Sequence, residues 1–105
     1  MSLIIKSLLT AGVLMTVMSS ANAQDAQALA NAKACMACHN VEAKVIGPSY
    51  KDVAAKYASD DKAIDLLVAS IKGGSTGKWG SVPMPPNPVT DDEAKTLATW
   101  ILSLK

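Results

Sequence analysis

The chain is poor in several residue types on which binding proteins commonly rely. None of its 105 residues is arginine or phenylalanine, and its only aromatic residues are two tryptophans and two tyrosines. Ten lysines against nine acidic residues give a formal net charge of +1, which is too small to neutralise a run of phosphates. Nucleic-acid binding driven by counterion release is therefore not expected.

The chain also has little material for a thick interior. Its length leaves room for one small domain. Half of the residues are hydrophobic, but much of that share is alanine, which buries little area per residue. We therefore expect a group other than side chains to fill part of the interior.

Hydrophobic residues gather near the N-terminus. Residues 1–23 carry one charged side chain, Lys6, then an apolar stretch of about a dozen residues and the small-residue ending Ala21-Asn22-Ala23. This layout predicts a secretory signal peptide that is cleaved after Ala23, and the alternative is an uncleaved membrane anchor. The stretch is shorter than the roughly 20 apolar residues that span a bilayer. We expect an exported protein in which residues 24–105 form one domain that stays off the membrane.

Apolar residues in the exported part recur at the spacing of helices, and no alternating strand pattern competes with it. The fold class is therefore predicted to be all-α. The expected helices cover residues 25–39, 50–57, 61–72 and 91–104. The third helix should stop at Gly73-Gly74, and the fourth starts with the capping-box spacing of Thr90 and Glu93.

A long segment rich in glycine and proline, residues 73–89, separates the last two helices. A loop of this length in a small domain is usually functional or disordered. It contains Trp79, Val82 and Met84, three apolar side chains that need a partner. A polyproline-like surface linker is the alternative.

The window Cys35-Met36-Ala37-Cys38-His39 uses both cysteines and the only histidine of the chain. C-x-x-C-H is the attachment sequence of c-type haem. Two thiols at this spacing can reach both vinyl groups of one porphyrin, and the adjoining histidine then faces the iron. Covalent attachment would also replace missing core.

Three other interpretations of this window have less support. A redox-active Cys-x-x-Cys disulfide expects a βαβ context that the sequence does not show. A structural zinc site needs a second pair of ligands. A plain disulfide would close a very short loop and would leave His39 unexplained.

A histidine-ligated haem iron has a sixth position to fill. Beyond residue 23, methionine occurs only at Met36, inside the attachment window, and at Met84, between prolines. The prolines restrict the backbone, so the loop could present the Met84 thioether with little entropy left to lose. The alternative is a methionine that fills a gap in the core.

Four segments carry a resemblance to a known family. They are CMACH at 35–39, GPSYKDVAAK at 47–56, the stretch from Trp79-Gly80 to PMPPN at 83–87, and DDEA at 91–94. Over nearly all of residues 24–105 the chain resembles class I cytochromes c, nearest to the small bacterial cytochrome c-551 (cytochrome c8) type. This resemblance implies about four helices wrapped around one covalently bound haem c with its iron.

The resemblance also implies roles for particular residues. Cys35 and Cys38 would form the thioether bonds, and His39 and Met84 would be the axial ligands of the iron. The Pro48 carbonyl would accept a hydrogen bond from the other ring nitrogen of the ligating histidine.

Two further residues match family positions, and one departs from them. Trp79 would donate to a haem propionate, and Asn87 would tune the methionine ligand, with ordinary packing as the alternative for both. The family commonly has an aromatic residue where this chain has Ala30. We therefore expect looser packing between the first and last helices near Ala30 and Trp100.

The implied function is a one-electron shuttle in the periplasm, not an enzyme. Histidine and methionine ligation favours ferrous iron and so raises the reduction potential. We expect a monomer that docks redox proteins through a small apolar patch. The resemblance suggests a cytochrome bc1-type complex as donor and a nitrite reductase, a terminal oxidase or a cytochrome c peroxidase as acceptor. The rival functions are a haem enzyme or gas sensor without the methionine bond, and an electron-transfer domain of a larger complex.

Overall fold

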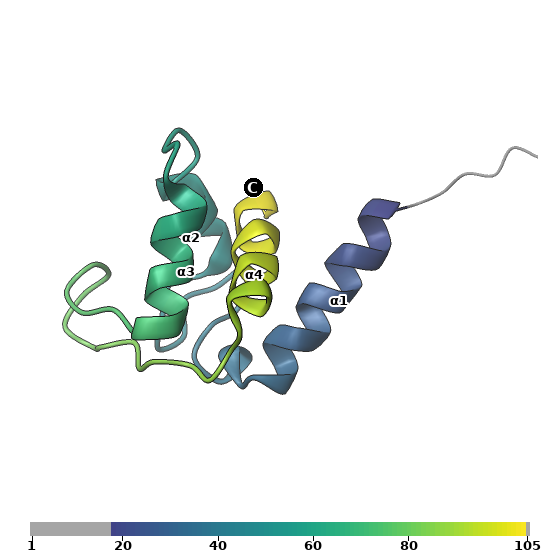
Figure 1. Ribbon diagram of the computed structural model, residues 1–105. Helices are drawn as coiled ribbons and strands as arrows, with labels where there is room; N and C mark the ends of the chain where they lie inside the picture. Colours follow the sequence, from purple (N-terminus) through teal and green to yellow (C-terminus); the bar gives the residue numbers. More distant parts are fainter. Residues whose placement is uncertain (1–17, 105) are drawn as a thin grey trace, which may run out of the picture.

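The computed structural model describes residues 18–104 and contains only helices and connecting segments over that range (Figure 1). The all-α prediction is confirmed. The elements are α1 (Met18–Ala32), the short 3-10 helix η1 (Cys35–Ala37), α2 (Tyr50–Lys56), α3 (Ala63–Gly73) and α4 (Asp91–Ser103). Within residues 18–104 no helix combines the length and the apolar character needed to cross a membrane.

The predicted signal peptide, residues 1–23, lies outside the described residues except for 18–23, which belong to α1. The cleavage site and the extent of the exported domain therefore stay predictions.

The first predicted helix, residues 25–39, is wrong at both ends, because α1 begins at Met18 and does not reach the attachment window. Helix α1 ends at Ala32, and Ala34 then takes a left-handed conformation with φ 61°. An alanine in this conformation gives no sequence signal, because the position is usually occupied by glycine or asparagine. The attachment window therefore lies on η1 and the turn after it, not on an α-helix.

The ends of the other helices follow their capping residues. The Ser49 hydroxyl accepts from the Asp52 backbone N–H at the start of α2. Helix α3 ends where Gly74 adopts φ 82°, as the Gly73-Gly74 pair predicts. At the start of α4 the capping box is confirmed, since Thr90 and Glu93 each bond the other's backbone N–H.

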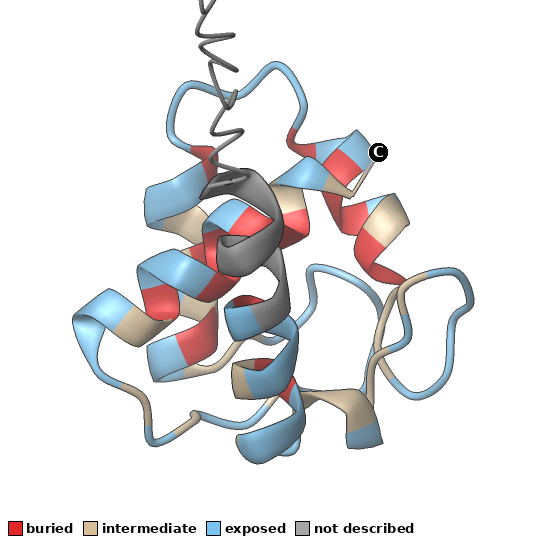
Figure 2. Ribbon diagram, turned by 90° about the vertical axis from the view of Figure 1, so that its right-hand side faces the viewer, coloured by how far each residue is buried: buried red, intermediate tan, exposed pale blue. Residues whose placement is uncertain are grey.

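Helix α4 lies at the centre of the packing, because it contacts α1, α2 and α3 (Figures 1 and 2). Its buried face carries Leu97 and Ile101 together with small alanines. Ala30 of α1 and Trp100 of α4 are both buried in one core cluster, and the expected looser packing between them stays a prediction.

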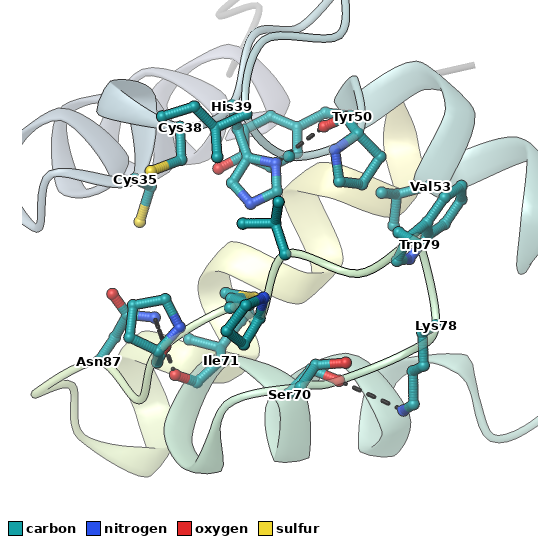
Figure 3. Close-up of a pocket in the computed structure, with 18 of the residues that line it drawn as sticks. Cys35, Cys38, His39, Tyr50, Val53, Ser70, Ile71, Lys78, Trp79 and Asn87 are labelled. Atoms are coloured by element: carbon teal, nitrogen blue, oxygen red, sulfur yellow. Dashed lines mark hydrogen bonds between the residues drawn. The ribbon is translucent and has the colours of Figure 1, made fainter.

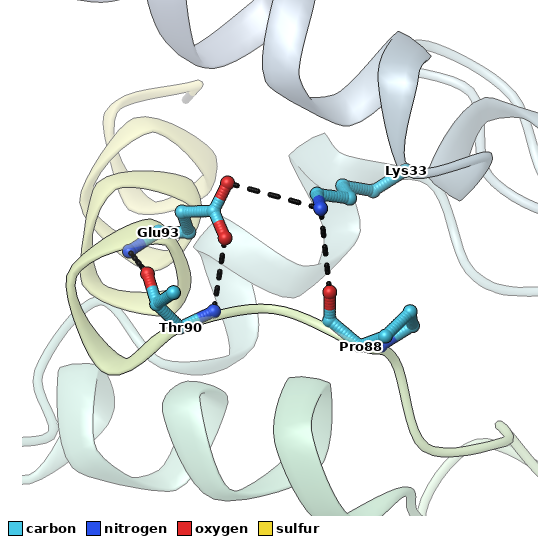
Figure 4. A network of polar contacts seen from close by, with 4 residues as sticks. All are labelled: Lys33, Pro88, Thr90 and Glu93. Carbon is cyan, nitrogen blue, oxygen red and sulfur yellow. Dashed lines mark hydrogen bonds and ion pairs between the residues drawn. The ribbon is translucent and has the colours of Figure 1, made fainter.

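Lys33 links the end of α1 to the start of α4 through polar contacts. Its ammonium donates to the Pro88 carbonyl oxygen at 3.3 Å and lies 3.9 Å from a Glu93 carboxylate oxygen (Figure 4). Because Glu93 also caps α4, one polar network joins α1, the end of the segment 74–90 that connects α3 to α4, and α4 itself.

Candidate functional site

A cavity of about 570 Å³ lies between the helices and the 74–90 segment (Figure 3). A volume of this size is typical of a pocket for an organic ligand. The apolar side chains that line it from the helices are Val53, Leu67, Ile71, Leu97 and Ile101. The attachment window lines one wall of the cavity, and the glycine- and proline-rich loop lines another.

On the first wall, the His39 side chain is held in place by its contacts with neighbouring residues. Its Nδ1 lies 2.8 Å from the Pro48 carbonyl oxygen. Because a carbonyl can only accept, Nδ1 carries the proton and the Nε2 lone pair is left for a ligand. The ring is stacked on Tyr50, with centroids 5.0 Å apart and planes 20° apart. Tyr50 in turn makes an edge-to-face contact with Trp100 in the core, with ring centroids 5.5 Å apart.

Gly47 permits the chain to pass closely over the imidazole. A Cβ atom placed on Gly47 would lie 2.5 Å from His39 Cε1 and 2.9 Å from Nδ1. The Gly47 N–H donates to the Cys38 carbonyl at 2.8 Å, so this close approach is held by the backbone. Any side chain at position 47 would displace either the ring or the loop.

The two cysteines lie on the same wall as His39, and both are half-buried and unjoined (Figure 3). Burial is the main reason that the pKa of the Cys35 thiol is raised. Tyr50 is buried beside it, and burial, with the nearby Cys35, raises the pKa of the phenol well above its usual range. Both groups are therefore neutral at ordinary pH.

Met84 is positioned on the second wall by its backbone. Its N–H donates to the Ser75 carbonyl at 2.8 Å, and its carbonyl accepts from the Ser75 N–H at 3.0 Å. Gly74 makes this pairing possible, because a Cβ atom there would lie 2.7 Å from the Met84 carbonyl oxygen.

Asn87 ties the end of the loop to helix α3. Its backbone N–H and its side-chain Nδ2 both donate to the Ile71 carbonyl, at 3.0 and 3.1 Å (Figure 3). Nδ2 also lies 3.2 Å from the Pro85 carbonyl. The amide therefore closes the segment just after Met84.

Trp79 stands at the edge of the cavity with 37% of its surface exposed. The Lys56 ammonium lies 4.4 Å from the centre of its ring. The fold thus brings every haem-binding residue that the sequence predicts to this one cavity. They are Cys35, Cys38, His39, Pro48, Trp79, Met84 and Asn87.

Comparison with known proteins assigns the family. The cytochrome c family pattern matches residues 23–105. The chain belongs to the cytochrome c family. It is 62% identical over 77 residues to cytochrome c-551 of Ectopseudomonas mendocina, which covers 73% of this chain and 94% of that protein. It is 55% identical over 100 residues to cytochrome c-552 of Hydrogenobacter thermophilus, which covers 95% of this chain and 98% of the relative.

A solved structure gives the same assignment. The crystal structure of wild-type Nitrosomonas europaea cytochrome c552 matches with a TM-score of 0.74 and 57% sequence identity, over 75% of this chain and 99% of that one. The resemblance to the class I cytochrome c-551 type is thereby confirmed. As a cytochrome c, the chain carries an iron-containing haem c that is covalently bound, and it has two cysteines for the attachment.

The residues of the cavity fit this group. Two cysteines, a histidine whose Nδ1 is held by Pro48 and a methionine all line one largely apolar space, and Gly47 lets the chain pass the imidazole without a side-chain clash. The chain is therefore a small electron-transfer haem protein.

Sequence reasoning missed three contributors to the site. Gly47 appeared only as part of a family segment, Gly74 only as a helix stop, and the stacking of Tyr50 on His39 not at all. A sequence pattern can identify a glycine near a segment that carries ligands. It cannot identify the atom that the glycine approaches, because that atom belongs to another part of the chain.

Proposed function

We propose that the protein is a periplasmic one-electron carrier, not an enzyme, in which Cys35 and Cys38 hold the haem and His39 and Met84 are the axial ligands of its iron. The observation that carries this proposal is that His39 and Met84 line the same largely apolar cavity, His39 within the attachment window and Met84 within the glycine- and proline-rich loop. Bound haem supplies a one-electron ferric and ferrous couple.

The protein's own residues favour transfer with little rearrangement. Pro48 holds the proton of His39 on Nδ1, which fixes the ring orientation and raises its basicity. The paired backbone of Ser75 and Met84 fixes the start of the thioether side chain. Leu97 and Ile101 give the cavity an apolar floor, which disfavours the extra positive charge of the oxidised state.

Partner docking is proposed at the mouth of the cavity. Ile46 and Val82, 55% and 62% exposed, line the cavity and offer a small apolar contact of the kind that brief redox encounters use. Three lysines form ion pairs with acidic residues of the chain, which reduces their pull on a partner. These pairs are Lys33–Glu93, Lys51–Glu42 and Lys72–Asp91.

The donor is proposed to be a cytochrome bc1-type complex, and the acceptor a nitrite reductase, a terminal oxidase or a cytochrome c peroxidase. Residues 1–23 would direct the chain to the periplasm and would then be removed, which leaves a monomeric domain of residues 24–105. The mass of the protein isolated from cells should equal that of residues 24–105 plus one haem.

The ligand assignment is tested with Met84→Ala, and Met36→Ala is the matched control. The ferric protein should show a weak far-red charge-transfer band from the bond between iron and sulfur. Met84→Ala should lose this band, become high-spin, bind carbon monoxide in the ferrous form and have a lower reduction potential, whereas Met36→Ala should keep the band. An unchanged spectrum for Met84→Ala would refute the ligand, and a high-spin parent protein would favour a haem enzyme or gas sensor.

A further inference from the structure

Two lysines, Lys56 and Lys78, lie beside Trp79 at one corner of the cavity. The Lys56 ammonium lies over the indole ring at 4.4 Å and donates to the Lys78 carbonyl oxygen at 3.3 Å. The Lys78 ammonium reaches the Ser70 hydroxyl at 3.5 Å (Figure 3). Lys78, Trp79 and Ser70 all line the cavity, while Lys56 is not among the lining residues.

These two lysines have no acidic partner among the described residues. The ion pairs found there involve Lys33, Lys51 and Lys72 instead. The contact between Lys78 and Ser70 is long and links a cation to a neutral hydroxyl, so it is readily exchanged for a stronger acceptor. This corner of the cavity therefore contains hydrogen-bond donors but no acidic side chain paired with them.

The bound haem would bring an anion. The two propionate carboxylates of haem lie at the porphyrin edge opposite the vinyl groups. The vinyl edge would be held at the two cysteines. Lys78 and Trp79 lie across the pocket from Cys35 (Figure 3). A carboxylate placed there would lie within reach of the Lys78 ammonium and the Trp79 indole N–H, and hydrogen bonds between ionised groups are stronger than neutral ones.

We propose that Lys78 pairs directly with one haem carboxylate, and that Lys56 is a positioning residue that holds the Trp79 indole N–H toward the same carboxylate. This inference rests on haem attachment at Cys35 and Cys38. A cation over the indole face fixes the ring and draws electron density from its N–H, which strengthens it as a donor. The hydrogen bond from Lys56 to the Lys78 carbonyl sets the backbone from which Lys78 reaches into the cavity.

The charge of Lys78 should then contribute to the reduction potential. A positive charge near the haem favours the ferrous state over the ferric one. Lys78→Gln should therefore lower the ferrous-to-ferric ratio at a fixed electrode potential by roughly three- to tenfold. This corresponds to about 28 to 59 mV for a one-electron couple at 59 mV per decade.

Two matched variants isolate this effect in the haem-loaded protein. Lys78→Arg keeps the charge and should keep the parent potential within a small margin. Lys62→Gln removes an exposed lysine that does not line the cavity, and should have little effect on the potential. If Lys78→Gln and Lys62→Gln shift the potential equally, the pairing of Lys78 with a haem carboxylate is wrong.

The role of Lys56 is read from the indole N–H resonances of the ferrous protein. The chain has two tryptophans, so Trp100, buried in the core, serves as an internal reference. Lys56→Gln should move the Trp79 indole resonance and leave that of Trp100 in place, and Lys56→Arg should restore it. If the Trp79 resonance does not move, or if both resonances move together, Lys56 does not position the indole.

These tests are separable from those of the proposed function. A missing far-red band in the parent protein would refute methionine ligation whatever Lys78 does. If the band is present and persists in Lys78→Gln but the potential matches that of Lys62→Gln, only the inference about the lysines fails.

Discussion

The two walls of the cavity hold their proposed iron ligands in different ways. His39 is fixed through its side chain, by the Pro48 carbonyl on one side and the Tyr50 ring on the other. Met84 is fixed through its backbone, by a pair of hydrogen bonds to Ser75. Each wall also has one glycine at the point of closest approach.

This difference follows from the chemistry of the two side chains. An imidazole is rigid and has a second nitrogen, so neighbours can orient it directly. A methionine side chain is flexible and has only a weak acceptor, so the chain can place it only by fixing where it starts. The histidine wall is also local in sequence, within residues 35–50, whereas the methionine wall depends on contacts with α3.

The largest effect is expected from Gly74→Ala on the methionine wall. Gly74 has φ 82° and ψ 173°, a conformation almost restricted to glycine, and the added Cβ would meet the Met84 carbonyl at 2.7 Å. We expect a loss of roughly 3 kcal/mol in the free energy of unfolding and a weakened far-red band. Denaturant titration and the ferric spectrum test this.

Gly73→Ala is the matched control for that variant. Nothing lies within 4 Å of a Cβ atom there, and Gly73 ends helix α3. It should be neutral or stabilise the protein by up to about 1 kcal/mol. Equal losses for the two variants would contradict the role of Gly74.

Gly47→Ala is the corresponding change on the histidine wall. The new Cβ would lie 2.5 Å from the His39 ring. The ring cannot turn away without losing its hydrogen bond to the Pro48 carbonyl. We expect a loss of roughly 2 kcal/mol in unfolding free energy and shifted His39 ring-proton resonances, with the far-red band largely kept. A lost band with unmoved His39 resonances would reverse the assignment of the two walls.

A smaller effect is expected from Asn87→Ala, which frees the end of the methionine loop from Ile71. The lost side-chain hydrogen bonds should cost about 1 kcal/mol and should perturb the far-red band. Asn40→Ala is the control next to His39, where the Asn40 side chain accepts from the backbone of Glu42 and Ala43. It should lower stability to a similar extent and leave the band intact.

The last test concerns the start of α4, whose residues Thr90, Asp91 and Glu93 line neither wall. Its Thr90 N–H lowers the pKa of Glu93, and Lys72 lowers that of Asp91. Because both pKa values are lower in the folded state, their stabilisation is present above the unfolded values and disappears as the pH falls through the folded ones. Urea titrations should therefore show stability declining below about pH 4.

Glu93→Gln should flatten that acid dependence while leaving the capping threonine in place. Thr90→Ala should cost about 1 kcal/mol at neutral pH, and Thr90→Ser should cost less because it keeps the hydroxyl. An acid dependence unchanged in Glu93→Gln would exclude this carboxylate as its source.

Much of the fold was predictable because its signals are local. The capping box at Thr90, the stop at Gly74 and the apolar spacing of α3 and α4 are each contained within a few residues. The attachment window is equally local, so its chemistry could be identified without a structure. The end of α1 could not be, because Ala34 takes a left-handed conformation that alanine seldom adopts.

By itself, the sequence determined the class of the fold, the position of most helices and the attachment of haem, because these depend on residues that are neighbours along the chain. Only the tertiary structure decided that Gly47 faces His39, that Gly74 faces Met84 and that Lys56 covers Trp79. Periodicity specifies which face of a segment is apolar, but not which distant atom that face meets, and packing settles that choice when all the helices assemble together.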